Sequence, residues 1–313
     1  MNEQPLITIG ITSYNALDSI NAAIQSAQDQ TWGNTEIVVV DDCSTDGTWE
    51  ALQTRKDKGE ALRLFQNPKN GGVAVSRNRI IKEAKGAFVA FFDDDDFSQP
   101  ERLEKQYNRI MKNEHPITLC HTDRLQKYPD GSRRIEPTID GHSGMAVAKR
   151  ILFGRPLKNR DIGSLATCSQ MAKLSTYQDL GGFDENFRRG EDTDLAIRTA
   201  LEGGHFVGVR EPLVEQTMTA SSDKKLKDEH QSWSALLDKH ALFLKDNAQH
   251  IHAQAWLDLK FQYYRGDKGG FVFGLLGLFL KHPILTGQRL LWSAPNIGFN
   301  MAYKKFQNRH RDI

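Results

Sequence analysis

The sequence predicts an α/β protein: a mostly parallel sheet of the nucleotide-binding type, flanked by helices and followed by a helical C-terminal extension. From Leu6 to Phe92, short β-branched and apolar runs alternate with helix-length segments, a pattern typical of βαβ units. The apolar runs end in polar or acidic residues, at the sheet edge where open α/β sheets bind ligands. The 313 residues suffice for one large α/β domain with an appendage.

Strands and helices are expected in alternation through this first part of the chain. The strands are Leu6–Thr12, Glu36–Val40, Leu62–Gln66 and Phe88–Phe92. The intervening helices cover about 17–30, 48–55 and 73–84, and each follows a loop rich in Ser, Asn, Asp or Gly. Because parallel strands end at one edge of the sheet, the polar residues after each strand should lie close together.

The run Phe88–Phe92 stops in four carboxylates, Asp93 to Asp96. Five consecutive apolar residues indicate a strand buried on both faces, so the acids begin where this strand leaves the sheet. Neighbouring carboxylates repel one another by about 1 kcal/mol per pair at roughly 4 Å in water, unless a cation lies among them. A solvated acidic turn is the alternative, but the position after a buried strand favours a divalent metal site.

The pattern is weaker beyond Asp96. A helix is expected over about 98–112 and strands at Ile117–His121 and His205–Val209, whereas 123–158 has poor periodicity. Acids at the start of the apolar-patterned segment Glu191–Arg198 suit a helix N-terminus, and aromatic and Leu residues recur at helical spacing over 221–264.

Composition excludes some classes of protein. Lys and Arg number 41 against 40 Asp and Glu, so the overall charge gives no reason to expect a nucleic-acid partner. The three cysteines, Cys43, Cys120 and Cys168, are widely spaced and form no Cys-x-x-Cys pair, which argues against a disulfide framework and a structural zinc site. A cytoplasmic location is expected, and no signal peptide is expected from the N-terminal residues.

Several motifs occur in an order that resembles one enzyme family. They are Val39 to Thr48, Gly72 to Asn78, Phe91 to Asp96, and Gly181 to Glu185 leading to Gly190-Glu191-Asp192. Together they resemble the family 2 glycosyltransferases, inverting enzymes of the GT-A fold, over roughly residues 5–215. The resemblance implies a catalytic domain over 1–220, with a nucleotide-sugar half at 1–96 and an acceptor half at 97–220, then a helical region at 221–313. The acceptor pocket is expected within 123–173.

The resemblance implies a donor site and a metal. Asp93 and Asp95 match the family's Asp-x-Asp motif for Mn²⁺ or Mg²⁺, with Asp95 the direct ligand and Asp96 supporting it. A UDP-sugar donor is implied, with Asp42 or its neighbour Asp41 accepting the uracil N3–H; either could instead be a turn or cap residue. The other donor-binding residues implied are Thr12, Tyr14, Asn15, Asn70, Gly72, Arg77 and Asp94, and Arg77 could instead face solvent.

Inversion requires a general base that takes the proton of the acceptor hydroxyl. Asp192 matches the family's base, with Glu191 beside it, and the acceptor implied is a glycan or lipid-linked glycan of a bacterial surface polysaccharide. Asp194 is expected to be structural, paired with Arg198 one helical turn later. The Gln-x-x-Arg-Trp motif of processive relatives is absent after Arg198, which favours transfer of a single sugar.

Two alternatives from the residues remain open. The chain could be a catalytically silent module that binds a nucleotide-sugar or glycan, because a fold alone never establishes activity. It could also be a nucleotidyltransferase of similar fold, but the loop Thr12 to Ala16 lacks the glycines and arginine expected there.

The C-terminal tail contains a short apolar run among basic residues. Phe271–Leu280 is ten residues long, half of the roughly 20 that span a bilayer. From Lys268 to Arg311 there is no acidic residue, and aromatic residues are interleaved with the basic ones. This composition favours peripheral contact with an anionic membrane at the inner face of the cell membrane. The alternative is a helical hairpin that packs on the catalytic domain or on a second subunit.

Overall fold

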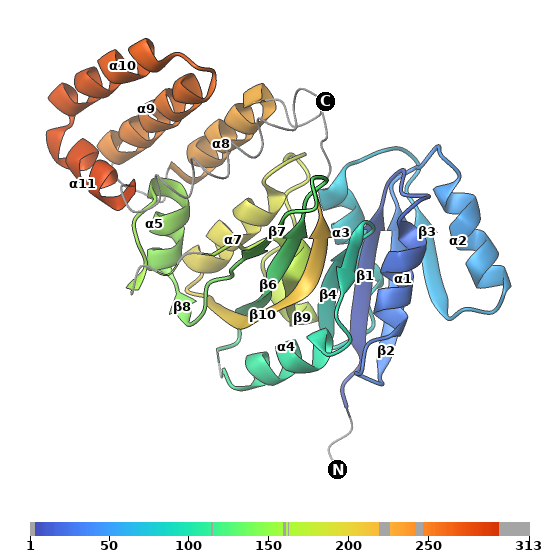
Figure 1. Ribbon diagram of the computed structural model, residues 1–313. Helices are drawn as coiled ribbons and strands as arrows, with labels where there is room; N and C mark the ends of the chain where they lie inside the picture. Colours follow the sequence, from blue (N-terminus) through green and yellow to red (C-terminus); the bar gives the residue numbers. More distant parts are fainter. Residues whose placement is uncertain are drawn as a thin grey trace. The chain divides into compact units, whose positions relative to one another are not determined.

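The computed structural model describes residues 4–113, 115–158, 161, 163–218, 226–241 and 247–293, and it divides into two compact units (Figure 1). Unit 1 consists of Met1–Ala148 and Leu157–Thr219. Unit 2 consists of Lys149–Pro156 and Ala220–Ile313.

Unit 1 contains a mixed sheet that is 10-stranded over the described residues, with the main order β3-β2-β1-β4-β9-β6-β10-β5. The strands are β1 Ile7–Ser13, β2 Thr35–Asp41, β3 Leu62–Gln66, β4 Phe88–Asp93, β5 Asp96–Ser98, β6 Thr118–Lys127, β7 Arg133–Glu136, β8 His142–Ser143, β9 Gln170–Lys173 and β10 His205–Thr217. Strands β3, β2, β1 and β4 run parallel to one another, as do β6 and β10, whereas β9 runs antiparallel between β4 and β6. The expected mostly parallel α/β sheet is therefore confirmed.

Helices cover both faces of this sheet. The helices of unit 1 are α1 Ile20–Gln28, α2 Thr48–Asp57, α3 Val73–Glu83, α4 Arg102–Met111, α6 Leu174–Asp179 and α7 Glu191–Leu201. Helix α5 Met145–Phe153 begins in unit 1 and ends in unit 2. Ile9 and Ile11 of β1 share one core with Ile20 and Ile24 of α1. On the opposite face Gly10 of β1 meets α3, where a Cβ on Gly10 would lie only 2.4 Å from Ile80. Alternation along β1 thus places α1 and α3 on opposite faces (Figure 1).

Two details differ from the sequence-based expectation. The helix expected from 98 begins at Arg102, because Asp96–Ser98 first forms the short strand β5 against β10. The last strand, expected to end at Val209, continues to Thr217. Pro212 lies inside it, where the pairing with β6 shifts register on both sides, so a bulge accommodates the residue that cannot donate to the ladder.

The poorly periodic part of the chain also holds elements that the sequence did not predict. The strand expected at Ile117–His121 extends to Lys127, and β7, β8 and α5 follow it within 133–153. Strand β9 and helix α6 come next. Strands β8 and β9 are short and pair with strands distant in sequence, so no local pattern specifies them. Strand β7 instead forms an antiparallel hairpin with β6, and the turn Tyr128-Pro129-Asp130-Gly131 between them is a local hairpin signal.

Unit 2 is helical in its described residues. It contains α8 Leu226–His240, α9 Asn247–Tyr264, α10 Lys268–Lys281 and α11 Pro283–Ser293. Asp267 caps α10 by accepting a hydrogen bond from Gly270 N, and Pro283 opens α11, where its missing N–H has no cost. None of the helices in the described part of the chain has the length and apolar character needed to cross a membrane. Part of the predicted basic and aromatic tail, including Phe299, Tyr303, Lys304 and Phe306, lies outside the described residues.

Candidate active site

The polar residues predicted after β1, β2 and β4 meet at one edge of the sheet. Ser13 pairs in register with Asp41 of β2, and Thr12 pairs with Asp93 of β4. The carboxyl ends of these three parallel strands therefore bring the polar turn after β1 beside two acidic strand ends.

The two acids at the end of β2 have different partners, although both are buried. Asp41 accepts hydrogen bonds from the backbone and side chain of Ser44 and from Gln66, so it fixes the turn after β2. Asp42 accepts from Asn67 Nδ2 at 2.8 Å and from the backbone N–H groups of Gly71 and Gly72 at 3.0 and 2.7 Å. Asp42 thus holds the glycine loop before α3 against the strand end.

The glycine loop is also bordered by a residue that sequence reasoning did not single out. Gly72 has φ 93°, a backbone conformation that side chains rarely adopt. Arg188 Cγ lies 4.0 Å from the position of a Cβ on Gly72, and Arg188 donates a hydrogen bond of 3.4 Å to Asn70 Oδ1. Arg188 lies a few residues before the expected catalytic acids Glu191 and Asp192. The sequence did not indicate it, because an exposed arginine in a loop has no distinguishing pattern.

The turn after β1 contacts both the acidic run and the loop after β2. Tyr14 N donates to Asp94 Oδ2 at 2.9 Å, and the Tyr14 side chain is exposed. Asn15 has φ 50° and accepts a hydrogen bond from Thr45 N at 2.8 Å. Burial, together with the charges of Asp95 and Asp93, raises the pKa of Asp94 to about 7. The turn is therefore fixed from two sides at the strand edge.

Arg77 of α3 joins the acids after β4 to those of α7. Its side chain is buried, with Nη1 2.6 Å from Glu191 Oε1 and Nη2 3.2 Å from Asp93 Oδ1. Its guanidinium also lies over the ring of Phe183, 5.5 Å from the centroid. The alternative that Arg77 faces solvent is therefore wrong, because the residue is the electrostatic link between two acidic groups 98 positions apart in sequence (93 and 191).

The acids that open α7 separate into paired and accessible groups. Burial raises the pKa of Glu191, although the facing Arg77 opposes this shift. Asp194 is buried and pairs with Arg198 at 2.8 Å, so the predicted one-turn pair is confirmed. Asp192 is half-buried, and its Oδ1 accepts from the backbone and hydroxyl of Thr193.

Oxygen ligands for a metal gather at the end of β4. Asp93, Asp96 and Cys168 each place a potential ligand atom within 4.8 Å of the others. Asp96 is buried with neither carboxylate oxygen hydrogen-bonded in the described residues, and burial with the charges of Asp93 and Asp95 raises its pKa to about 8. Burial raises the pKa of the Cys168 thiol well above its usual value, so a thiolate is disfavoured. Asp95 is exposed beside these groups. Carboxylate oxygens of this kind fit Mg²⁺ or Mn²⁺.

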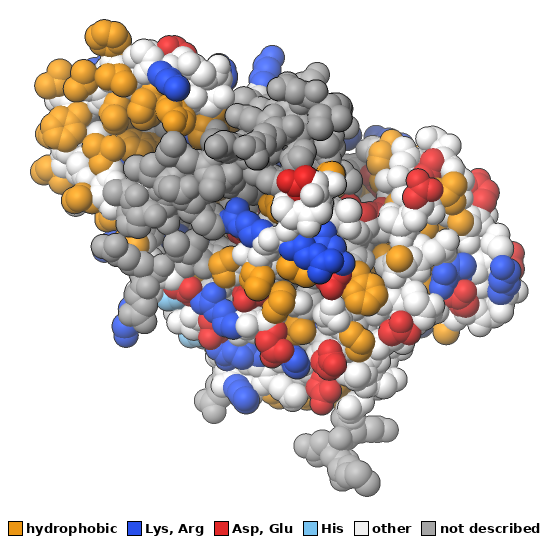
Figure 2. Space-filling view, in the orientation of Figure 1, with side chains coloured by type: hydrophobic (Ala, Val, Ile, Leu, Met, Phe, Trp, Pro, Cys, Tyr) orange, Lys and Arg blue, Asp and Glu red, His pale blue; other side chains and the backbone are white. Residues whose placement is uncertain are grey.

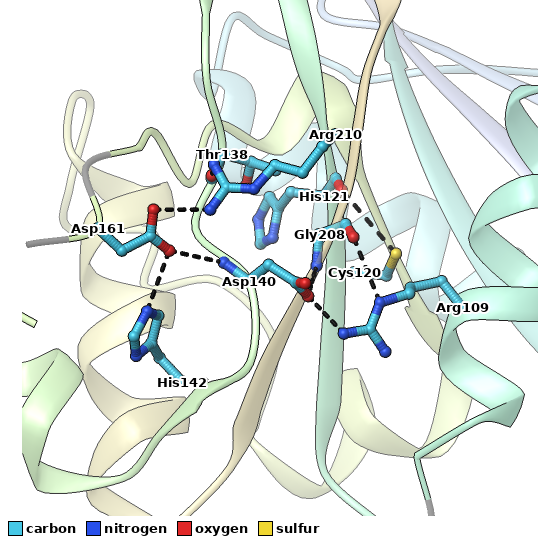
Figure 3. Close-up of polar contacts among 9 residues, drawn as sticks. All are labelled: Arg109, Cys120, His121, Thr138, Asp140, His142, Asp161, Gly208 and Arg210. Carbon is cyan, nitrogen blue, oxygen red and sulfur yellow. Dashed lines mark hydrogen bonds and ion pairs between the residues drawn. The ribbon is translucent and has the colours of Figure 1, made fainter. Parts of the chain in front are cut away.

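A second polar cluster in unit 1 binds the loop before α5 to β10 (Figure 3). Asp140 accepts from Arg109 and from Gly208 N, and Asp161 accepts from Arg210, from Asp140 N and from His142. A cavity of about 440 Å³ adjoins this cluster. Asp140 and Asp161 each have a cationic partner among the described residues, which is typical of a structural network.

The fold matches solved structures of S. aureus TarS. The structure of S. aureus TarS 1-349 in complex with UDP-GlcNAc aligns with a TM-score of 0.63 and 18% identity, over 98% of this chain and 91% of that chain. At this identity the likeness shows the fold alone, and the fold is GT-A.

The sequence comparisons show the family. The model for glycosyl transferase family 2 matches residues 8–172. A Bacillus subtilis protein named as a teichuronic acid biosynthesis glycosyltransferase, TuaG, is 40% identical over 234 residues, 74% of this chain and 87% of the relative. An Escherichia coli protein, the UDP-Glc:α-D-GlcNAc-diphosphoundecaprenol β-1,3-glucosyltransferase WfaP, is 39% identical over 101 residues, 32% of this chain and 39% of the relative. The chain belongs to glycosyl transferase family 2.

Proposed function

We propose that this family 2 enzyme is metal-dependent and inverting, and transfers one sugar from a UDP-sugar to a glycan or lipid-linked glycan in the synthesis of a bacterial surface polysaccharide. The observation that carries the proposal is the Arg77 bridge, because it holds Asp93 of the donor edge beside the Glu191-Asp192 pair. The donor and acceptor classes are supported by the UDP-GlcNAc complex of TarS and by the name of WfaP.

In this proposal the nucleotide lies on the edge formed by β1 and β2. Thr12, Tyr14 and Asn15 contact it from one side, and Asn70 and Gly72 from the other. We assign recognition of the uracil N3–H to Asp42, whose Oδ2 accepts one hydrogen bond from Gly72 and keeps a second lone pair. Asp41 is then proposed to support the nucleotide site indirectly, because it fixes the turn after β2 through Ser44.

The acids after β4 would hold the divalent ion. Asp93 and Asp95 are the proposed ligands, with Asp96 supporting them, and Mn²⁺ or Mg²⁺ bound there would supply Lewis-acid neutralisation of the donor diphosphate. Asp94 stays a proposed donor-binding residue. Arg77 keeps Asp93 in place through the 3.2 Å contact and adds a positive charge that no deprotonation removes.

The acceptor hydroxyl is proposed to lose its proton to Asp192. Thr193 holds Oδ1 of Asp192 through two hydrogen bonds, which orients the carboxylate and leaves Oδ2 to accept the proton. Glu191 cannot turn toward the acceptor without breaking its 2.6 Å contact with Arg77. Glu191 is therefore proposed to hold the start of α7 in place through Arg77, and Asp192 is the proposed base.

The proposed place of the reaction is the inner face of the cell membrane. Lys268, Lys281 and Arg289 are the described basic residues of the tail, and α10 and α11 carry exposed apolar side chains between them. Peripheral contact through this region would bring the enzyme to a lipid-linked acceptor.

The test uses UDP-GlcNAc with the purified chain. We expect Mn²⁺ with UDP-GlcNAc to raise the melting temperature, since a ligand stabilises by RT ln(1 + [L]/Kd), and we expect slow release of UDP. Asp95→Ala should abolish the Mn²⁺-dependent part of donor binding without unfolding the chain. Binding without UDP release, with and without acceptor glycans, would favour the catalytically silent module instead.

A further inference from the structure

Unit 2 contains a cavity of its own, of about 200 Å³. Three segments form it: the end of α5 with the residues after it, α9 and α11. The lining residues are Lys149, Phe153, Arg155, Gln249, His252, Leu285, Gln288, Arg289 and Trp292. Three of them are cations and none is an acid.

Arg289 is a partly buried cation of this cavity. Its guanidinium lies over the ring of Trp256, 5.6 Å from the centroid. On another side it packs on Gly154, where a Cβ would lie 3.1 Å from Arg289 Cζ. Burial lowers the pKa of Arg289 to about 10. Among the described residues, Arg289 forms no ion pair with a carboxylate, and neither do Lys149 and Arg155.

An enclosed cation without an anion is costly, because the lost hydration is not replaced. The neighbouring histidine does not relieve the positive charge. His252 is buried and exchanges a hydrogen bond with Thr286, and burial together with the charges of Arg289 and His282 lowers its pKa to about 4. The cavity is therefore positive at neutral pH through Lys149, Arg155 and Arg289 alone, which is the arrangement of an anion site.

Exposed apolar side chains gather on α11, which lines the cavity, and on α10, which does not (Figure 2). They are Val272, Phe273, Leu276, Phe279 and Leu280 of α10 and Ile284, Leu290 and Leu291 of α11. Leu280 is 81% exposed and Phe273 79% exposed. An exposed apolar surface of this kind indicates a site of contact with a membrane or with another protein.

Helix α11 carries both features. Ile284 and Leu291, seven residues apart, point to the exposed apolar surface, whereas Leu285, Arg289 and Trp292 face the cavity. Seven residues are close to two helical turns, so each set occupies one stripe of the helix. A ligand with an anionic head and an apolar body has the chemistry to match both stripes of α11.

We propose that the cavity of unit 2 binds the phosphate group of a lipid headgroup, with the exposed side chains of α10 and α11 in contact with the acyl chains. This inference rests on the membrane contact proposed above and adds a specific site to it. Charge favours a lipid surface over a second copy of the chain. The sequence from Lys268 to Arg311 has no acid, so two copies facing each other would oppose cations, whereas anionic lipids attract them.

The experiment is co-sedimentation of the full-length chain with vesicles of phosphatidylcholine alone or with phosphatidylglycerol. We expect binding only to the latter, and the double variant Lys149→Gln/Arg155→Gln should bind at least tenfold more weakly. The matched control is Lys227→Gln/Arg265→Gln, which removes one exposed lysine and one exposed arginine of unit 2 outside the cavity. If the cavity is a specific site, the control should bind vesicles within about twofold of wild type. If only surface charge matters, both double variants should lose a similar share of binding, because each exposed cation contributes a roughly equal amount.

Two further measurements separate the parts of the proposal. Leu280→Ser/Ile284→Ser should weaken vesicle binding without lowering the melting temperature, because both side chains are exposed. Glycerol 3-phosphate, added with EDTA, should raise the melting temperature of wild type but not of Lys149→Gln/Arg155→Gln.

The outcomes are distinguishable. If both double charge variants lose vesicle binding equally, the membrane contact stands and the phosphate site is overturned. If glycerol 3-phosphate stabilises the chain while vesicles are ignored, the cavity takes a soluble phosphate and the lipid proposal is overturned. Release of UDP from UDP-GlcNAc in solution, measured alongside, reports on the proposed transferase and not on this site.

Discussion

The two units enclose arginine side chains in different ways. In unit 1, Arg77 reaches Glu191 and Asp93, and Arg102 donates to Ser98, Gln106 and the carbonyl of Phe91. In unit 2, Arg289 has an aromatic ring and a glycine as its neighbours, and burial lowers its pKa to about 10. An enclosed cation whose partners belong to the chain stabilises the fold. The absence of such a partner for Arg289 among the described residues is the reason for proposing a phosphate ligand in unit 2.

The acids of α7 show the same distinction. Glu191 and Asp194 both have an arginine within 2.8 Å, whereas the hydrogen bonds of Asp192 in the described part of the chain come from Thr193. The paired acids are therefore expected to matter for stability, and the accessible acid for turnover.

The largest effect is predicted for Asp192→Asn. Loss of the general base should slow sugar transfer by roughly 10² to 10⁴ with little change in donor affinity. The measurement is steady-state release of UDP, with donor binding followed by calorimetry. Glu202→Gln, at the exposed end of the same helix, is the control and should transfer at the wild-type rate. Near-normal turnover in Asp192→Asn would move the base to another acid.

The next largest effect is predicted for Arg77→Met. This change leaves Glu191 and Asp93 without their buried counter-charge, which should lower the free energy of unfolding by about 3–5 kcal/mol. Arg79→Gln is the matched control on α3, because its pair with Glu83 is one turn long and partly exposed, and such pairs contribute about 0.5 kcal/mol or less. Urea denaturation in EDTA measures both. An equal loss of unfolding free energy in both variants would mean that the contacts of Arg77 with Glu191 and Asp93 stabilise the fold no more than an exposed ion pair does.

Much of the donor edge follows from local sequence. The alternation from Leu6 to Phe92 specifies β1 to β4, and acids after buried strands mark Asp42 and Asp93. The partners of those acids do not follow, because Arg77 and Glu191 are far apart in sequence and only the folded chain brings them together. Strand β9 was missed for a related reason, since four residues between two distant strands have no periodicity of their own. The extension of β10 past Pro212 depends on a bulge that no sequence pattern encodes.

A smaller effect is predicted for pH, through a neutral histidine in unit 1. Burial and the charges of Arg124 and Arg102 lower the pKa of His121 to about 3. Between about pH 6.5 and pH 3, His121 is protonated in the unfolded chain but neutral in the folded chain. The free energy of unfolding therefore decreases as the pH falls through this range. The slope is about 1.4 kcal/mol per pH unit. In His121→Gln, whose side chain can still accept a hydrogen bond from Gln170, this part of the slope should disappear from urea curves at pH 7, 6 and 5. An unchanged slope would mean that His121 protonates in the folded chain.

The smallest effect is predicted for Arg289→Met in phosphate-free buffer, and it tests the comparison between the units directly. Removing Arg289 gives up its contact with Trp256, worth about 0.5–2 kcal/mol, but also removes a desolvated charge that no carboxylate of the described residues balances. The free energy of unfolding should therefore change by less than about 1 kcal/mol, in contrast to Arg77→Met, which leaves two acids behind. Glycerol 3-phosphate should then stabilise wild type and not the variant. A loss as large as that of Arg77→Met would show that Arg289 is held by the chain itself, and the distinction between the two units would fail.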